Sequence, residues 1–146
     1  MKTVKILIPV FLFAVTGVFS QTQNINNKSY GTADADKATI ALSDIYNFSG
    51  EQALAVKQIE IAKFQNLADI ASLKVSDLTR FVQKRITTFN LADSEIRDVL
   101  DDRQRILFDK NTTAKAQKMN ATVASWQKQK ISEAVINQKL AAIEEW

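Results

Sequence analysis

The sequence contains no cysteine and no histidine, and only three glycines and one proline among its 146 residues. The first two absences exclude a thiol nucleophile, a Ser-His-Asp triad and a metal site built from thiolates or imidazoles. So few chain-breaking residues leave few tight turns, which favours helices over a multi-stranded β-fold. We therefore expect one all-α domain that is not an enzyme and has no catalytic residues and no cofactor.

Residues 1–20 are typical of a secretory signal peptide. Lys2 and Lys5 precede an apolar run over residues 6–18, and Ser20 offers a small side chain at the expected cleavage site. A membrane anchor is the alternative interpretation, but thirteen apolar residues are short for a bilayer. We expect a periplasmic or secreted protein with no stable membrane insertion.

The charge balance changes when the signal peptide is removed. The whole chain has 19 basic and 16 acidic residues, and loss of Lys2 and Lys5 leaves 17 basic residues and a net charge of +1. This balance, together with export, argues against nucleic acid as a partner. An exported chain without disulfides must be stabilised by helix packing, and we expect a homodimer that buries additional surface.

Four acidic residues lie within eight positions: Glu95, Asp98, Asp101 and Asp102. Carboxylates are ligands for hard cations such as Ca²⁺, so a metal site is one interpretation. Arginines alternate with these acids, however, and acidic residues are favoured at helix starts in any case. We prefer helix capping and solvated ion pairs, and we expect no metal site.

Two short segments have the residues of a helix-capping box. In FSGEQ, the Ser49 hydroxyl is placed to accept a hydrogen bond from the Gln52 amide, while the Gln52 side chain reaches back to the Ser49 amide. LDDRQ repeats the pattern 52 positions later, with Asp101 as the cap and Gln104 as the returning side chain. Each segment predicts the start of a helix.

Between these segments, apolar residues recur every eleven positions. One row contains Val56, Leu67, Leu78 and Phe89, and a second contains Ile59, Ile70 and Phe81. Eleven residues fill three turns at about 3.67 residues per turn, which keeps each row on one side of a nearly straight helix. We expect a helix over residues 50–89, continuous or mildly bent; the alternative is a break near residues 74–77, with Ser76 as a new cap.

The rest of the mature chain predicts a leader, short helices and a returning arm. Asparagine-rich residues 21–32 predict a flexible leader, and a short helix follows them. Residues 90–93 predict the turn after the long helix, and a helix from Asp101 returns along it. The expected organisation is a signal peptide (1–20), a leader (21–32), a helical domain (33–119) and a C-terminal helical extension (120–146).

The two capping segments resemble the LTxxQ motif of the Spy/CpxP family of periplasmic proteins. Each copy has an apolar residue, a capping residue and a glutamine: Phe48, Ser49 and Gln52 in the first, and Leu100, Asp101 and Gln104 in the second. The copies depart from the Leu-Thr of the family but keep its capping chemistry. Over residues 33–119, the resemblance implies an all-α subunit built on a long helical hairpin with short flanking helices, which forms a cradle-like dimer.

The resemblance also implies a chaperone that works without ATP and binds unfolded or stress-damaged proteins on a mixed apolar and basic helical surface. The candidate surface is one side of the long helix: Val56, Ile59, Lys63, Leu67, Ile70, Lys74, Leu78 and Phe81. Trp126 and Trp146 are candidate dimer or client contacts, since tryptophan is enriched at interfaces; packing of the extension is the alternative. The alternative function is a regulatory or structural adaptor of the envelope-stress response that docks on a dedicated partner such as a sensor kinase.

Overall fold

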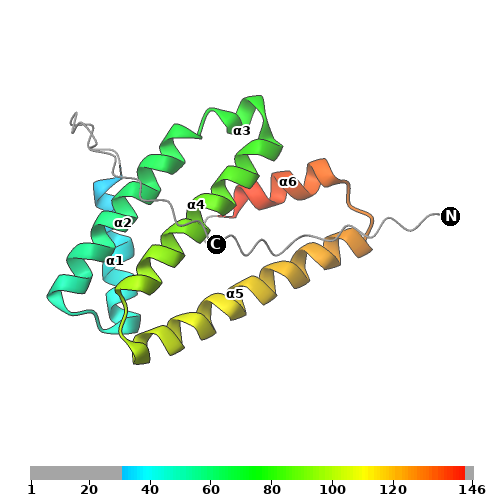
Figure 1. Cartoon of the computed structure of the whole chain (residues 1–146). Coiled ribbons are helices and arrows are strands. Elements are labelled where there is room, and N and C mark those ends of the chain that lie inside the picture. Colours follow the sequence, from blue (N-terminus) through cyan, green and yellow to red (C-terminus); the bar gives the residue numbers. More distant parts are fainter. Residues whose placement is uncertain (1–30, 144–146) are drawn as a thin grey trace.

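The computed structural model describes residues 31–143, and this part of the chain is all-helical, as predicted (Figure 1). Its helices are α1 (Thr32–Tyr46), α2 (Gly50–Asp69), α3 (Leu73–Ser76), α4 (Leu78–Val99), α5 (Asp102–Lys128) and α6 (Glu133–Ala142). No strand occurs within the described range. The signal peptide, nearly all of the predicted leader and Trp146 lie outside it.

The first two helices form an antiparallel pair, and one glycine lets them approach closely. Asn47, in the left-handed conformation at φ 54°, ends α1 and begins the reversal into α2. Gly31 precedes α1 at φ 90°, and a Cβ on this residue would lie 2.6 Å from the Phe64 Cβ near the end of α2. Glycine is therefore required at position 31 both for its backbone conformation and for its missing side chain.

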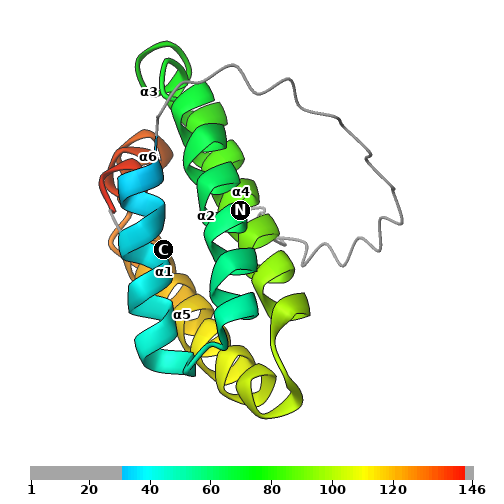
Figure 2. The same cartoon turned by 90° about the vertical axis from the view of Figure 1, so that its left-hand side faces the viewer.

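The prediction of one long helix over residues 50–89 is wrong. α2 ends at Asp69, and the chain reverses through the short α3 so that α2 and α4 lie side by side (Figures 1 and 2). Asp77 begins α4 by accepting a hydrogen bond from the Arg80 amide at 3.0 Å, whereas the Ser76 hydroxyl donates to the Ser72 carbonyl. The eleven-residue rows keep their phase through this break because both helices turn their apolar rows towards the same interior.

The turn expected at residues 90–93 is also wrong, because these residues lie inside α4. Asn90 and Asp93 are weak helix formers, but propensity yields to packing. Ala92 and Ile96 are 4% and 2% exposed on the inner side of α4, so the helix buries its apolar face without interruption. α4 therefore continues to Val99, directly before the second capping segment.

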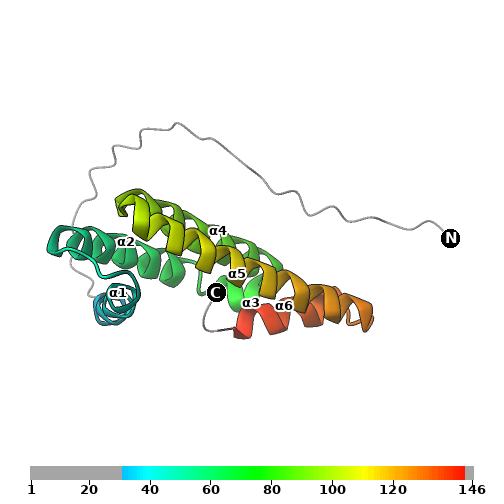
Figure 3. The same cartoon turned by 90° about the horizontal axis from the view of Figure 1, so that it is seen from below.

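The expected boundary at residues 119–120 falls in the middle of α5, which continues to Lys128. A turn with Lys130 at φ 57° then brings α6 back onto α4. In Figure 1, α4, α5 and α6 outline a triangle. Figures 2 and 3 show α1 and α6 on the same side of the α2–α4 pair.

Two separate hydrophobic clusters hold the helices together. The first lies where α1, α2, α4 and α5 meet and contains Tyr46, Val56, Ile96, Leu100 and Phe108. The second joins α4 to α6 and contains Phe81, Val82, Ile136, Leu140 and Ala141. Because the clusters share no buried residue, the two ends of the fold are stabilised by different contacts.

Candidate functional site

Both capping boxes are formed. The Ser49 hydroxyl accepts from the Gln52 amide at 3.2 Å, and the Ser49 amide donates to Gln52 Oε1 at 3.0 Å. At the start of α5, Asp101 Oδ1 accepts from the Gln104 amide and the Asp101 amide donates to Gln104 Oε1, both at 2.9 Å. Each box satisfies amides that would otherwise lack a partner at the helix start.

The two boxes also bind each other through their glutamines, a contact that we call the glutamine clasp. Gln52 Nε2 donates to Gln104 Oε1 at 2.7 Å, and Gln104 Nε2 donates to Gln52 Oε1 at 3.1 Å. Gln52 Nε2 also donates to the Val99 carbonyl at 3.1 Å, and Gln104 Nε2 donates to the Tyr46 carbonyl at 3.0 Å. Each glutamine thus caps its own helix and holds the loop that precedes the other.

The apolar residue of each segment anchors the clasp to the first cluster. Leu100 is 2% exposed within that cluster, and Phe48 packs against its edge. The Phe48 ring stacks on Tyr46 with centroids 6.1 Å apart, and Asn111 donates to the Tyr46 hydroxyl at 3.1 Å. Four of the six residues therefore join the α1–α2 corner to the α4–α5 corner, namely Phe48, Gln52, Leu100 and Gln104, whereas Ser49 and Asp101 cap their own helices.

The α4–α5 corner is further fixed by an exposed ion pair. Arg97 Nε and Nη2 donate to the two carboxylate oxygens of Asp109 at 2.7 and 2.9 Å. The hydrogen bond from Arg97 lowers the pKa of Asp109; desolvation opposes it, and the attraction of the Arg97 and Arg105 charges adds to the lowering. Arg97 and Asp109 belong to α4 and α5, so the pair holds the two helices close beside their connection.

The side chains predicted to form a client surface are largely interior. Val56 and Phe81 are 0% and 8% exposed and belong to the first and second clusters. Three others are partly buried against these clusters: Ile59, Ile70 and Leu78. Leu67 is half-buried and Lys74 is exposed. Since the predicted long helix is folded back on itself, its apolar side is a helix–helix contact in this structure.

Lys63, the basic member of that predicted surface, lies between α2 and α4. It forms an ion pair with Glu60, which is 1% exposed. Its ammonium lies 5.0 Å from the Phe64 ring centroid and 5.3 Å from that of Phe89. Lys63 thus pairs with the buried Glu60 carboxylate inside the fold, although Glu60 Oε2 has no hydrogen-bond partner among the described residues.

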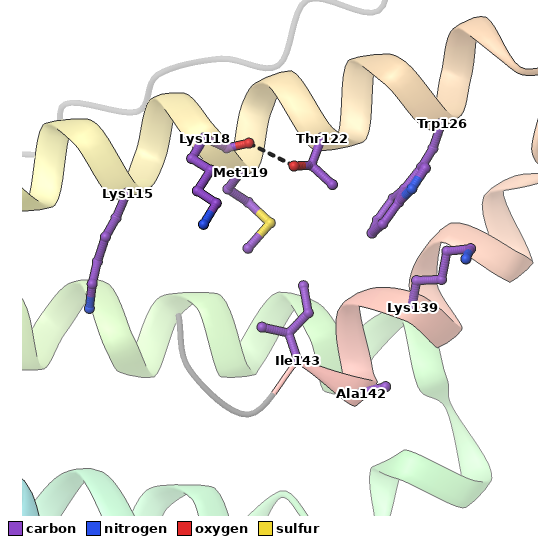
Figure 4. A pocket seen from close by; sticks show the side chains of 8 residues that line it. All are labelled: Lys115, Lys118, Met119, Thr122, Trp126, Lys139, Ala142 and Ile143. Carbon is purple, nitrogen blue, oxygen red and sulfur yellow. Dashed lines mark hydrogen bonds between the residues drawn. The ribbon is translucent and has the colours of Figure 1, made fainter.

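The structure instead contains an open groove between α5 and α6, which we call the α5–α6 groove (Figure 4). Its cavity volume is about 590 Å³, and it combines apolar side chains with lysines: Lys115, Lys118, Met119, Thr122, Trp126, Lys139, Ala142 and Ile143. Lys139 Nζ lies 5.3 Å from the Trp126 ring centroid, so the predicted interface residue Trp126 is a wall of this groove.

A buried arginine fixes the α6 side of the groove. Arg85 is 8% exposed and donates from Nη1 to the carbonyls of Leu140 and Ala141, each at 3.4 Å, and from Nη2 to that of Ile143. These carbonyls belong to the last turn of α6 and the residue after it, where a cation is favourable. Desolvation by burial lowers the pKa of Arg85, but an arginine remains charged.

The segment that supplies the groove residues differs in charge from the rest of the fold, although Asp93 of α4 interacts electrostatically with Lys115. Residues 110–143 contain six lysines and one acidic residue, Glu133, whereas residues 31–109 contain ten basic and 13 acidic residues. Sequence reasoning concentrated on the lysines of α2 and α4 and missed this groove. The signal available in the sequence was the run from Lys110 to Ser132, which has five lysines and no acidic residue.

Within residues 31–143, no group of three or more acidic side chains is arranged to hold a metal ion. Asp101 serves as a helix cap and Asp102 pairs with Arg105 at 3.6 Å, so two members of the acidic set 95–102 have structural partners. In the same range, no helix combines the length and hydropathy needed to cross a bilayer.

Comparison with protein-family models, curated proteins and solved structures finds no match to this chain. The resemblance to the LTxxQ family therefore remains a prediction.

Proposed function

We propose that the protein is a periplasmic chaperone of the Spy/CpxP type, which binds unfolded or stress-damaged proteins without ATP, and that the α5–α6 groove is its client-binding surface. The observation that carries the proposal is the composition of the groove: Met119, Trp126 and Ile143 offer apolar area beside three lysines. A segment of an unfolded protein exposes apolar side chains and charges together, and such a mixed, open surface suits it.

The expected binding is weak and reversible. Burial of one large apolar side chain contributes about 1.5–3 kcal/mol, whereas micromolar binding requires about 8 kcal/mol. One groove therefore holds a client only through several simultaneous contacts. Because a client buries the same side chains when it folds, folding removes them from the groove, and release needs no nucleotide hydrolysis.

Homodimerisation belongs to the same proposal, because a second groove adds contacts. Several large apolar side chains are exposed in the described part of the chain, and a second copy could cover some of them: Ile40, Ile45, Leu54, Leu91 and Ile106. Sedimentation equilibrium of the chain from Gln21 tests this part, with a mass of two chains as the expected result. A single-chain mass throughout the concentration range would refute the dimer but would not affect the proposal that clients bind the groove.

The chaperone activity is tested by the aggregation of an unfolding client in the presence of the chain from Gln21. We expect suppression at a near-stoichiometric ratio and loss of suppression in the double variant Lys115→Glu/Lys118→Glu, which alters the groove charge. The matched control is Lys110→Glu/Lys128→Glu, which makes the same charge change on α5; both positions lie about 140° around the helix from Lys115 and about 80° from Lys118, and neither lines the groove. No suppression by the unaltered chain at several-fold excess would refute the function.

Crosslinking in the native envelope separates this function from dedicated docking. A chaperone is expected to give many crosslinked proteins, each in small amount. Crosslinking to one partner at equal stoichiometry, such as a sensor kinase, would refute the chaperone function. It would support the adaptor function that the family resemblance also implies.

A further inference from the structure

The turn between α5 and α6 is made without the residues that usually end a helix. The last glycine in the sequence is Gly50 and the one proline is Pro9. No chain-breaking residue therefore lies between Asp102 and Ala142, the first residue of α5 and the last of α6. Lys130 has the left-handed conformation at φ 57°, where glycine is favoured because a Cβ crowds the following carbonyl. The local sequence thus favours one continuous helix, and contacts with other helices hold the turn.

The turn also starts a new helix end that a continuous helix would not have. The Ile131 amide donates to the Trp126 carbonyl at 3.1 Å, which ends α5 in a turn of the Schellman type. α6 then begins after Ser132, whose side chain forms no capping hydrogen bond. A helix that continued through residues 129–132 would pair the first amides of α6 with the carbonyls that precede them.

The contacts that hold α6 in place are made mainly with α4. Ile136 and Leu140 are buried in the second cluster, which joins the two helices. Arg85 of α4 donates to carbonyls at the end of α6, and Asn137 donates to the Thr79 hydroxyl of α4 at 3.1 Å. None of these contacts requires that α4 and α6 belong to the same chain, so α6 of a second copy fits the same surface.

We propose that the turn at residues 129–132 is a hinge, and that α6 packs on α4 of a second copy when α5 and α6 form one straight helix. The exchange is reciprocal and gives a closed, domain-swapped dimer. Within one chain the straight helix and the α4–α6 contacts exclude each other, whereas the swapped dimer has both. The α5–α6 groove is retained, with its α5 wall from one copy and its α6 wall from the other. This dimer gives an interface to the homodimer proposed above and does not rest on client binding.

Two substitutions at Lys130 should shift the equilibrium between the single chain and the swapped dimer in opposite directions. Lys130→Gly removes the cost of the left-handed conformation from the bent hinge, about a factor of ten for each chain. Because a dimer contains two hinges, its dissociation constant should rise about 100-fold. Lys130→Val raises the cost, since a β-branched residue is rarely left-handed, and should lower the dissociation constant.

Sedimentation equilibrium of the chain from Gln21, after refolding from urea, measures these dissociation constants. Asn47→Gly is the matched control, because Asn47 is the other non-glycine residue with positive φ among residues 31–143 but lies between α1 and α2. This change should leave the dissociation constant unaltered. Equal constants for the two Lys130 variants, or a single-chain mass for the unaltered chain at every concentration, would overturn the proposal.

Crosslinking between α4 and α6 identifies the copy that supplies α6. The chain has no cysteine, so Thr79→Cys is introduced in one chain and Asn137→Cys in another, at two side chains that are in contact. The two chains are mixed, refolded from urea and treated with a short bismaleimide. We expect a two-chain product linked between positions 79 and 137, and a low yield when Gln138→Cys, about 100° further around α6, replaces Asn137→Cys.

A dimer that gives no crosslink between positions 79 and 137 of different chains would overturn the swap and assign the dimer to another surface. The same result is expected to leave suppression of client aggregation unchanged, because neither readout uses a client. Failure of the hinge proposal and failure of the chaperone proposal are therefore distinguishable.

Discussion

The glutamine clasp makes a quantitative prediction for a double-mutant cycle of Gln52→Ala and Gln104→Ala. The Gln52 side chain takes part in four hydrogen bonds, to the Ser49 amide, the Val99 carbonyl and, twice, the Gln104 amide group. A net hydrogen bond contributes about 1 kcal/mol, and water partly replaces those lost from a half-buried position. We therefore expect each single substitution to lower the free energy of unfolding by about 3 kcal/mol.

The two shared hydrogen bonds decide the size of the coupling. Each single substitution already removes both Gln52–Gln104 bonds, so the double variant loses them only once. The sum of the two single effects should exceed the effect of the double variant by about 2 kcal/mol. Independent helix caps, each acting only on its own amide, would instead give additive effects.

Urea unfolding of the chain from Gln21, followed by far-ultraviolet circular dichroism, measures all four corners of this cycle. Gln58→Ala is the matched control, because Gln58 lies exposed on the same helix as Gln52 and its loss should change stability by less than about 0.5 kcal/mol. Additivity of the Gln52 and Gln104 effects within about 0.5 kcal/mol would refute the clasp and leave two separate capping boxes.

Three further predictions concern other contacts of the fold. Arg85→Met should destabilise the protein by about 2–4 kcal/mol, because the α6 carbonyls of Leu140, Ala141 and Ile143 lose a charged donor; hydrogen exchange of the α6 amides should accelerate more than that of α1. Gly31→Ala should lower the free energy of unfolding by about 1–3 kcal/mol, because of the positive φ and the clash with Phe64. Gly50→Ala is the control: nothing lies within 4 Å of the added Cβ, so thermal unfolding should show a stabilisation of about 0.4–1 kcal/mol. Asp109→Asn should lower stability at neutral pH. Because the folded-state pKa of Asp109 is lowered, the difference in stability from the unaltered chain should vanish as the pH falls through this folded-state pKa. A pH-independent difference in urea titrations would contradict this prediction.

The local signals in the sequence identify several helix starts and the fold class. Ser49 and Asp101 begin α2 and α5 with the expected partners, because a capping box is a contact between residues three positions apart. The meeting of Gln52 with Gln104 spans 52 positions and depends on how the helices fold back. No local rule contains that information, so the clasp appears only in the structure.

The reversal between α2 and α4 shows why periodicity alone misplaced the candidate surface. An eleven-residue repeat states which side of a helix is apolar, and it is equally satisfied by one straight helix or by two antiparallel helices that face each other. Asp77 is a helix-capping residue, which is consistent with a break at this point. The eleven-residue spacing of Leu67, Leu78 and Phe89 instead favoured one continuous helix. Because the chain reverses, most side chains of the predicted surface are buried between helices. The mixed apolar and basic surface is instead formed by α5 and α6.

Photo-crosslinking from the two sides of α5 tests most directly whether the α5–α6 groove is the client-binding surface. A photoreactive amino acid is placed at Thr122, which lines the groove, or at Ala124, which is exposed about 160° further around the helix. The purified chain is irradiated with a client during unfolding. We predict client crosslinks from position 122 and few from position 124. Equal yields from both positions, or a higher yield from 124, would contradict the assignment of the groove.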